Sequence, residues 1–321
     1  MSYKSSDRVV SSCYAHGKLL LTGEYYVLNG ALSLALPTKL GQSLNVFTHD
    51  DGGIIHWISK DNNQQVWFSA AFDCRSLDPI SYTDEKVAKQ LSDIFKAIKL
   101  LKSYANLNFK GLQFETHLEF PLQWGLGSSS TLIALLASFY SCNPYQLLDL
   151  TMRGSGYDIA CAFAKKPILY QRIADQVDQP IVKPINFSPS FQDQLLLVYL
   201  EQKQNSRQSI AQFKKLSDEV LIKKNVALIS NITEEMLLCD DMKVFEKLIS
   251  VHENIISTSL NIERCKNKLF PDYRGEVKSL GGWGGDFVLA TCPDGVEEAA
   301  LYFEKKGFRT TIKYDDIILG S

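Results

Sequence analysis

The strongest structural signal in this sequence is a glycine- and serine-rich segment, Pro121-Leu122-Gln123-Trp124-Gly125-Leu126-Gly127-Ser128-Ser129-Ser130-Thr131. Apolar and polar residues alternate from 112 to 120, which is typical of a half-buried strand. Apolar residues recur at helical spacing from 132 to 140, which indicates a buried helix. The segment therefore predicts a strand, a glycine loop and the start of a helix.

This arrangement has a chemical use. Gly125 and Gly127 carry no side chain, so the backbone can bend sharply and approach a ligand closely. The hydroxyls of Ser128, Ser129 and Ser130 follow at the position where a helix presents its unpaired N–H groups. A helix N-terminus carries a partial positive charge and binds phosphate groups. The local pattern fits a phosphate site and an ordinary Gly-Ser turn with a serine cap equally well.

The composition excludes several classes of protein. The chain has 321 residues, 45% of them hydrophobic and 22% charged, which suits one large or two ordinary domains. Its 34 basic and 36 acidic residues leave a formal net charge of −2, so we expect neither nucleic acid nor an anionic membrane as a partner. The seven cysteines lack Cys-x-x-Cys spacing, which argues against a disulfide framework and a zinc site. No apolar run approaches the roughly 18 residues of a membrane span, and the N-terminus lacks a signal-peptide core. We expect a soluble, cytoplasmic protein.

The first half of the chain predicts a sheet covered by helices. Asn29-Gly30 indicates a hairpin turn. Short strands near 44–48, 54–59 and 66–68 suggest a meander. An amphipathic helix is expected over 84–104, and Asn143-Pro144 should start another, because proline is tolerated in the first turn.

The second half predicts a separate domain. Residues 175–190 are rich in Pro, Gln, Asn and Ser, which is typical of a domain crossover. We therefore expect domains at 1–180 and 181–321. A strand is expected over 194–200, helical segments up to about 261, a helix over 295–306 and a final strand over 308–314.

Three further positions can carry chemistry, and each has a plainer interpretation. Lys18 follows Ala15-His16-Gly17 at a strand entry, where it fits a ligand contact or an ordinary solvated lysine. Asp158 ends the tight turn Gly154-Ser155-Gly156-Tyr157-Asp158, where it fits a helix cap or a catalytic carboxylate. The segment Lys278-Ser279-Leu280-Gly281-Gly282-Trp283-Gly284-Gly285-Asp286 fits a loop that approaches a ligand closely or a plain hairpin connection.

Three separated segments resemble, in order, the signature motifs of the GHMP kinases, the superfamily of galactokinase, homoserine kinase, mevalonate kinase and phosphomevalonate kinase. They are Ala15 to Lys18 with Gly23-Glu24-Tyr25, then Pro121 to Ser130, then Lys278 to Asp286. The resemblance spans nearly the whole chain. The run from Gly23 to Gly30 looks like the mevalonate-pathway members, and the turn at Asp158 with the third segment is closer to phosphomevalonate kinase than to mevalonate kinase.

The resemblance implies an α+β fold with two domains. The N-terminal ATP-binding domain would be of the type of ribosomal protein S5 domain 2, the C-terminal domain would be ferredoxin-like, and the site would lie between them. ATP and magnesium are the implied cofactors. The expected reaction transfers the γ-phosphoryl group of ATP to a small anionic acceptor, phosphomevalonate or mevalonate, and a monomer or homodimer is expected.

The resemblance also implies roles for single residues. Asp158 matches the candidate base and Lys18 the lysine near it; a nearby ammonium would keep the carboxylate ionised and neutralise charge on the transferring group. A serine hydroxyl, that of Ser129, would bind magnesium. The implied ATP-binding residues are Pro121, Gly125, Leu126, Gly127, Ser128, Ser129 and Ser130. The implied acceptor-binding residues are Glu24, Tyr25, Ser155, Gly281, Gly282, Gly284 and Gly285.

The sequence departs from the family pattern at three places. His16 replaces the usual proline, and Trp283 occupies a small-residue position. No glutamate lies between Ser129 and Asp158 to serve as a second magnesium ligand. Asp149 is a loose substitute, and magnesium held by Ser129, phosphates and water is the alternative.

Three alternatives follow. A diphosphomevalonate decarboxylase-like enzyme shares the superfamily but lacks the Gly-Glu-Tyr text in its first segment. The absence of the magnesium-binding glutamate is also compatible with a non-catalytic nucleotide-binding protein of this fold. Unrelated nucleotide chemistry is disfavoured because the chain has neither a Walker loop nor a strand-linked Gly-x-Gly-x-x-Gly. Arg153, Arg207 and Lys278 fit a phosphorylated acceptor and plain surface charges equally well.

Overall fold

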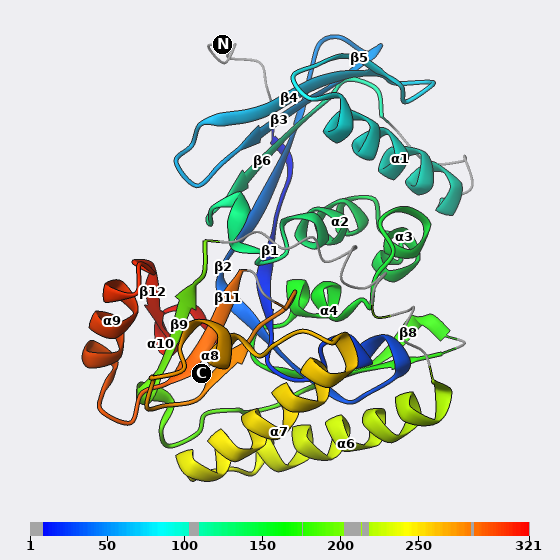
Figure 1. Ribbon diagram of the computed structural model, residues 1–321. Helices are drawn as coiled ribbons and strands as arrows, with labels where there is room; N and C mark the ends of the chain where they lie inside the picture. Colours follow the sequence, from blue (N-terminus) through cyan, green and yellow to red (C-terminus); the bar gives the residue numbers. More distant parts are fainter. Residues whose placement is uncertain are drawn as a thin grey trace. The chain divides into compact units, whose positions relative to one another are not determined.

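The computed structural model describes residues 9–102, 109–174, 176–201, 213, 218–283 and 286–320 (Figure 1). Its contacts divide into two compact units. The first unit is built within residues 1–17, 40–122 and 127–163, and the second within 18–39, 123–126 and 164–321. Strands β1 (Val9–Leu20) and β2 (Ser33–Thr48) cross these boundaries, so each contributes residues to both units. The expected domain boundary near residue 180 stays a prediction.

The first unit contains a mixed sheet with the strand order β5, β4, β3, β6, β2. Strands β3 and β6 run parallel, and the other neighbours in this order are antiparallel. Because parallel strands need a crossover connection, the chain between β3 and β6 includes α1 (Glu85–Leu101). The remaining strands of the sheet are β3 (Ile54–Lys60), β4 (Val66–Asp73), β5 (Pro79–Tyr82) and β6 (Leu112–Leu118). The expected meander is confirmed for β3 and β4, but β6 lies between β2 and β3.

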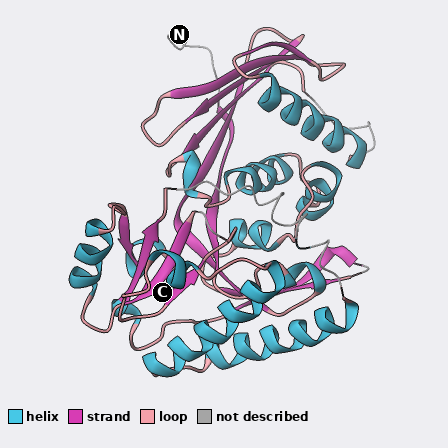
Figure 2. Cartoon of the chain, viewed as in Figure 1, coloured by secondary structure: helices cyan, strands magenta, loops and turns pink. Residues whose placement is uncertain are grey.

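Helices cover one face of this sheet (Figure 2). Buried and half-buried residues alternate along β3 and β6, as the period-two pattern predicts. The buried faces carry aromatic rings: Trp57 stacks on Phe114 with centroids 5.4 Å apart, and Phe95 of α1 lies 5.9 Å from both. The other helices of the unit are α2 (Ser128–Phe139), α3 (Pro144–Thr151) and α4 (Tyr157–Phe163).

The helix starts follow the sequence signals. Asp84 caps α1 by accepting a hydrogen bond from the backbone N–H of Val87 at 3.0 Å. Asn143 caps α3 by accepting from the N–H groups of Tyr145 and Gln146. Side-chain oxygens of Asp and Asn satisfy N–H groups that a helix leaves unpaired. The predicted helix starts at 84 and 143 are therefore confirmed.

The second unit contains a four-stranded antiparallel sheet in the order β10, β11, β9, β12. Among the described residues, α6, α7 and α8 lie between β9 and β10 along the chain, and α9 lies between β11 and β12. This β-α-β-β-α-β order is the predicted ferredoxin-like arrangement. The strands are β9 (Leu195–Tyr199), β10 (Val277–Ser279), β11 (Phe287–Thr291) and β12 (Thr311–Lys313). The helices are α6 (Glu219–Leu237), α7 (Met242–Leu260), α8 (Cys265–Leu269), α9 (Val296–Lys305) and α10 (Tyr314–Ile317).

Shorter elements complete the description. The start of β2 pairs with β7, and β7 pairs with β8, both antiparallel. The remaining elements are the strands β7 (Ile168–Ile173) and β8 (Gln176–Pro184) and the 3-10 helices η1 (Tyr26–Asn29), η2 (Leu122–Trp124) and η3 (Gln192–Gln194). Among the described helices, none is long and apolar enough to cross a membrane.

Two local predictions were wrong, and one strand was not predicted. Asn29-Gly30 does not form a hairpin turn; Tyr26 to Asn29 form η1, which Gly30 ends with a φ of 86°. Residues 176–184, in the segment expected to hold the domain crossover, form β8, most of whose side chains are exposed; the crossover itself stays a prediction. The last strand, β12, is shorter than expected because Tyr314 already starts α10. The α+β class itself is confirmed.

The aromatic core of the first unit yields a stability prediction. Phe114 is fully buried and has four ring neighbours, whereas Trp67 on β4 is 36% exposed. We expect Phe114→Ala to lower the free energy of unfolding by about 3–5 kcal/mol through the lost burial and the cavity. The control Trp67→Ala should lower it by about 1 kcal/mol or less. Urea titrations followed by circular dichroism measure both, and equal losses would contradict this account of the core.

Candidate functional site

The glycine loop has the backbone that a phosphate site requires. Gly125 and Gly127 have φ angles of 66° and 95°, a region that favours glycine. Gly127 is the N-cap of α2, and its carbonyl accepts hydrogen bonds from the N–H groups of Ser130 and Thr131 at 3.0 and 2.9 Å. No side chain caps this helix start. The predicted strand, glycine loop and helix start are confirmed.

In the first unit, the structure brings Asp158 together with the serines of α2. The Ser130 hydroxyl donates a hydrogen bond to Oδ2 of Asp158, and the N–H of Ile159 donates to Oδ1 at 3.0 Å. Asp158 lies in the first turn of α4, which packs against α2. Asp158 therefore lies in the first turn of a helix with its carboxylate directed at Ser130 of α2, and its catalytic role stays a prediction.

The other predicted site residues of the first unit lie close in sequence to Ser130 or to Asp158. Ser128 is half-buried and Ser129 exposed in the first turn of α2. Pro121 is half-buried just before η2. Ser155 is half-buried between Gly154 and Gly156, whose φ angles of 153° and 89° form the tight turn before α4.

In the second unit, Lys18 holds the first half of the glycine loop. Its ammonium donates to the carbonyl of Gly125 at 2.7 Å, and its backbone N–H donates to the carbonyl of Leu126 at 2.9 Å. Leu126 is fully buried. Lys18 therefore contacts a predicted phosphate-binding segment through both its backbone and its side chain, which a solvated lysine would not do.

The third glycine segment reaches the same loop through a residue that the sequence analysis did not assign to the site. A Cβ added at Gly125 would lie 2.3 Å from Oδ2 of Asp286, so the carboxylate sits directly against this glycine. Asp286 is 8% exposed. Gly281, with a φ of 68°, lies on the Lys18 side: its Cβ position is 4.0 Å from the Lys18 ammonium. The only signal for Asp286 was its place directly after the four glycines.

Tyr25 and Trp283 connect two predicted acceptor-binding segments. The N–H of Trp283 donates to the Tyr25 hydroxyl at 3.1 Å, and Tyr25 has a φ of 63°. Both side chains are buried with Phe213, whose ring centroid lies 5.5 Å from that of Tyr25. Trp283 therefore fills space in the interior of this unit. Gly282 is buried beside it, while Gly284, Gly285 and Arg207 lie outside the described residues.

Glu24 lies in a buried group of charges. Its Oε1 accepts a hydrogen bond from the Lys278 ammonium at 2.6 Å, and Glu253 accepts from the same ammonium at 3.2 Å. Glu24 is 1% exposed and Lys278 is fully buried, so the surface-charge interpretation of Lys278 was wrong. Contact between Glu24 and an acceptor stays a prediction.

The described residues contain no cluster of three His, Cys, Asp or Glu side chains arranged to hold a metal ion. Asp149, the loose substitute for the missing glutamate, is exposed near the end of α3. The Ser129 hydroxyl has no hydrogen-bond partner among the described residues.

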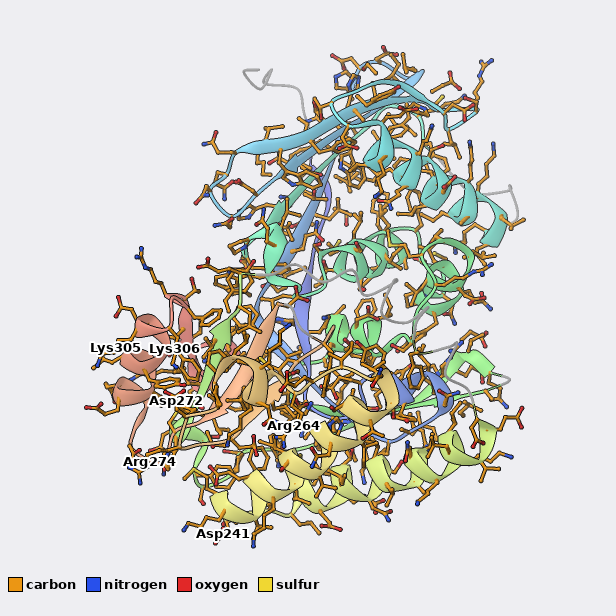
Figure 3. The ribbon with its side chains drawn as sticks, viewed as in Figure 1. Asp241, Arg264, Asp272, Arg274, Lys305 and Lys306 are labelled. Carbon is orange, nitrogen blue, oxygen red and sulfur yellow. The ribbon has the colours of Figure 1, made fainter. Side chains whose placement is uncertain are left out.

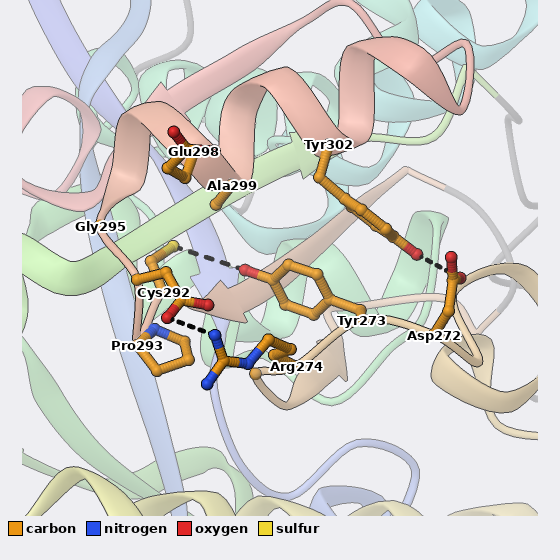
Figure 4. Close-up of a pocket in the computed structure, with 11 residues that line it drawn as sticks. Asp272, Tyr273, Arg274, Cys292, Pro293, Gly295, Glu298, Ala299 and Tyr302 are labelled. Carbon is orange, nitrogen blue, oxygen red and sulfur yellow. Dashed lines mark hydrogen bonds and ion pairs between the residues drawn. The ribbon is translucent and has the colours of Figure 1, made fainter.

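A surface cavity of about 510 Å³ lies on the second unit and contains none of the predicted site residues (Figure 4). It is bounded by the segment before β10 and by the start of α9. Figure 3 labels Asp272 and Arg274, which lie in the segment before β10. Arg274 pairs with Asp294 at 2.8 Å, and Asp272 accepts hydrogen bonds from Tyr302 and Lys306. Because these charged groups are paired with one another, we assign no ligand to the cavity.

Comparison with solved structures identifies the fold. An L. major mevalonate kinase in complex with R-mevalonate is 16% identical, with 99% of this chain and 98% of that chain covered and a TM-score of 0.63. A Streptococcus pneumoniae phosphomevalonate kinase in complex with phosphomevalonate and AMPPNP is 15% identical, with 95% and 100% covered and a TM-score of 0.69. A Lactococcus lactis galactokinase complexed with galactose is 13% identical, with 99% and 94% covered and a TM-score of 0.68.

Sequence comparisons with family models and with curated proteins found no match. The structural matches extend over nearly the full length of both partners. The chain therefore has the two-domain fold of the GHMP kinases. The fold is similar to those of a mevalonate kinase, a phosphomevalonate kinase and a galactokinase alike.

The contact between Gly125 and Asp286 yields a second prediction. Gly125→Ala would strain a backbone at φ 66° and displace the Asp286 carboxylate. We expect it to lower the free energy of unfolding by about 1–3 kcal/mol. Gly52→Ala is the control, because a Cβ there meets no atom within 4 Å and no positive φ is involved. Urea unfolding of both variants tests this, and a G125A protein as stable as the G52A protein would contradict it.

Proposed function

We propose that this chain is an ATP-dependent kinase that transfers the γ-phosphoryl group of ATP to a small anionic acceptor. The observation that carries the proposal is the Ser130–Asp158 hydrogen bond at the open start of α2. A helix N-terminus without a side-chain cap offers N–H groups to phosphate oxygens, and Asp158 places a carboxylate beside it. The fold supports the same conclusion, because the similar solved structures include three kinds of small-molecule kinase.

The glycine loop would bind the ATP phosphates. Gly125 and Gly127 hold the backbone in positive-φ conformations, so its N–H groups can approach phosphate oxygens without a side chain in the way. The Ser128 hydroxyl and the first N–H groups of α2 add donors at the positive end of the helix dipole. The proposed ATP-binding set is Pro121, Gly125, Leu126, Gly127, Ser128, Ser129 and Ser130. An AMPPNP complex of a structurally similar kinase supports nucleotide binding by this fold.

Asp158 would act as the base that accepts the proton of the acceptor hydroxyl. Its Oδ2 is oriented by the Ser130 hydroxyl and its Oδ1 by the N–H of Ile159. Two hydrogen bonds, one to each oxygen, fix the plane of the carboxylate. Lys18 would neutralise charge on the transferring phosphoryl group, since Gly125 already holds its ammonium at the glycine loop.

Magnesium would be held by few protein ligands. Magnesium usually keeps several water ligands and is bound by substrate phosphates together with one or two protein oxygens. The hydroxyl of Ser129, an exposed residue in the first turn of α2, could supply one such oxygen. When bound, the ion would neutralise phosphate charge during transfer. The missing glutamate is compatible with such a site because phosphates and water complete the shell.

The acceptor is proposed to be phosphomevalonate or mevalonate. The motifs resemble those of the mevalonate-pathway kinases, and two structurally similar proteins are complexes with these compounds. Tyr25 and Trp283 lie in the segments proposed for acceptor binding, and their hydrogen bond couples those segments. The proposed acceptor set is Glu24, Tyr25, Ser155, Gly281, Gly282, Gly284 and Gly285.

Replacing the proposed base gives the third prediction. Asp158→Asn should lower turnover by about 10²- to 10⁴-fold, the usual contribution of acid–base catalysis, without unfolding the protein. Asp93→Asn makes the same change of charge on an exposed position of the same unit and should leave turnover unchanged. Near-normal turnover in D158N would remove Asp158 from the mechanism.

The assay is ADP release from magnesium ATP, with mevalonate and phosphomevalonate offered separately. Release that depends on one acceptor and is lost in D158N would support the proposal and identify the acceptor. Acceptor-dependent release of carbon dioxide would instead indicate the decarboxylase alternative. Nucleotide binding without turnover on a wider set of small alcohols and sugars would indicate a non-catalytic protein.

A further inference from the structure

Four ionisable side chains meet in the interior of the second unit. Lys278 of β10, Glu253 and His252 of α7, and Glu24 before η1 are each 1% exposed or less. Isolated charges are very costly in such a place, so the group must be close to neutral overall. The hydrogen bonds within the group show which of its side chains are charged and which are neutral.

Lys278 is the cation of this group. Its ammonium donates to Oε1 of Glu24 at 2.6 Å, to Oε1 of Glu253 at 3.2 Å and to its neighbour's carbonyl, that of Ser279, at 2.9 Å. An ammonium has three protons and no lone pair. All three donors are used, so the geometry fits a charged Lys278.

Glu253 is the matching anion. Its Oε1 accepts from Lys278, and its Oε2 accepts from the backbone N–H of Ser279 at 3.2 Å. Both oxygens therefore face donors. A carboxylate accepts hydrogen bonds and donates none, so a proton on either oxygen of Glu253 would point at another proton.

Glu24 differs from Glu253 on one oxygen. Its Oε1 accepts from Lys278, but its Oε2 is buried and receives no hydrogen bond in the described structure. The polar atom facing Oε2 is Nε2 of His252, at 3.3 Å. That nitrogen already accepts a hydrogen bond from the backbone N–H of Gly23 at 3.1 Å. Two lone pairs therefore face each other unless a proton lies between them.

Placing that proton on His252 does not satisfy the contacts. A proton on Nε2 would point at the N–H of Gly23, and a doubly protonated ring would add a second cation beside Lys278. The Nδ1 atom is buried without a partner among the described residues; it carries a proton both in the neutral ring that accepts at Nε2 and in the cation, so it does not distinguish these two states. Burial and the Lys278 ammonium accordingly hold the pKa of His252 well below its usual value.

We propose that Glu24 is a neutral carboxylic acid whose Oε2–H donates a hydrogen bond to Nε2 of His252. The four side chains then carry one positive charge, on Lys278, and one negative charge, on Glu253. Every contact between them pairs a donor with an acceptor. Arg264 (labelled in Figure 3) forms an ion pair with Glu276 at 2.8 Å. We therefore do not count its positive charge as part of this group.

The directions of the two pKa shifts agree with this assignment. Burial raises the pKa of Glu24 to about 7, against the lowering effect of Lys278. Burial also raises the pKa of Glu253, but Lys278, the N–H of Ser279 and Arg264 oppose the rise. Because the two carboxyl groups share one ammonium, they titrate as a pair, and the contacts decide that Glu24 keeps the proton.

The buried acid makes Glu24 a positioning residue for the segment that carries Tyr25. Through Lys278 it is tied to β10, and through His252 it is tied to α7. The N–H of Gly23 is held by the same imidazole. This inference is independent of the proposed kinase activity, since it concerns the folded state of the second unit alone.

A matched pair of substitutions tests the assignment. In Glu24→Gln, the amide can accept from Lys278 with its oxygen and donate to His252 with its nitrogen, so both contacts survive. In Glu253→Gln, the amide nitrogen must face either the Lys278 ammonium or the N–H of Ser279. We expect E24Q to change the unfolding equilibrium constant by less than about threefold and E253Q to raise it by about 10- to 100-fold. Urea unfolding at about pH 6 measures both. An E24Q protein that is destabilised as much as E253Q, or that does not fold, would overturn the proposal.

The pH dependence gives a second measurement. The folded-state pKa of Glu24 is raised, so the stability that the proton contributes is complete below the ordinary carboxyl pKa and is lost as pH rises through about 7. The stability of the wild-type protein relative to E24Q should therefore fall between about pH 5 and about pH 8. A constant difference would overturn the proposal. Infrared difference spectra at about pH 6 should show a protonated carboxyl band in the wild type that E24Q lacks, and no such band would also overturn it.

Discussion

The ammonium of Lys278 imposes the strongest constraint on the second unit. It is fully buried, and a buried charge is tolerated only when hydrogen-bonded partners of opposite charge surround it. Its three acceptors come from the segment before η1, from α7 and from its own strand β10. Those elements must therefore keep their register relative to one another, and removing one partner would leave an uncompensated charge in the interior.

This constraint fixes the backbone on both sides of the third glycine segment. Lys278 and Ser279 anchor the start of the segment, while the carbonyl of Asp286 accepts from the N–H of Leu200 at 2.8 Å beyond its end. Between these anchors, Trp283 is tied to the Tyr25 hydroxyl. The hairpin interpretation of the segment is confirmed, since β10 and β11 pair as a hairpin. The Asp286 side chain also presses against Gly125, but close approach of the segment to a ligand stays a prediction.

In the first unit, the packing of helices places the carboxylate of Asp158 at the start of α2. Two short helices, α2 and α4, pack together, and the Ser130 hydroxyl bridges to Asp158. Ser130 is buried, so this hydrogen bond forms with little competition from water. The exposed Ser129 and half-buried Ser128 leave the end of the helix dipole accessible. The fold is shared with kinases of several substrates, and function is proposed from this site because a fold alone does not imply an activity.

The sequence by itself determined the elements whose signals are local. The sequence predicted the alternation in β6, the apolar face of α1, the helix starts at Asp84 and Asn143 and the glycine loop before α2, because each depends on residues a few positions apart. The three motifs also indicated the fold that the structure has. Arrangements over longer separations were not predicted: the strand β8, the contact of Asp286 with Gly125 and the burial of Lys278. Glu24 and Lys278 are 254 positions apart. Whether such side chains are exposed charges or interior partners depends on which segments the packing brings together, and only the tertiary structure decides that.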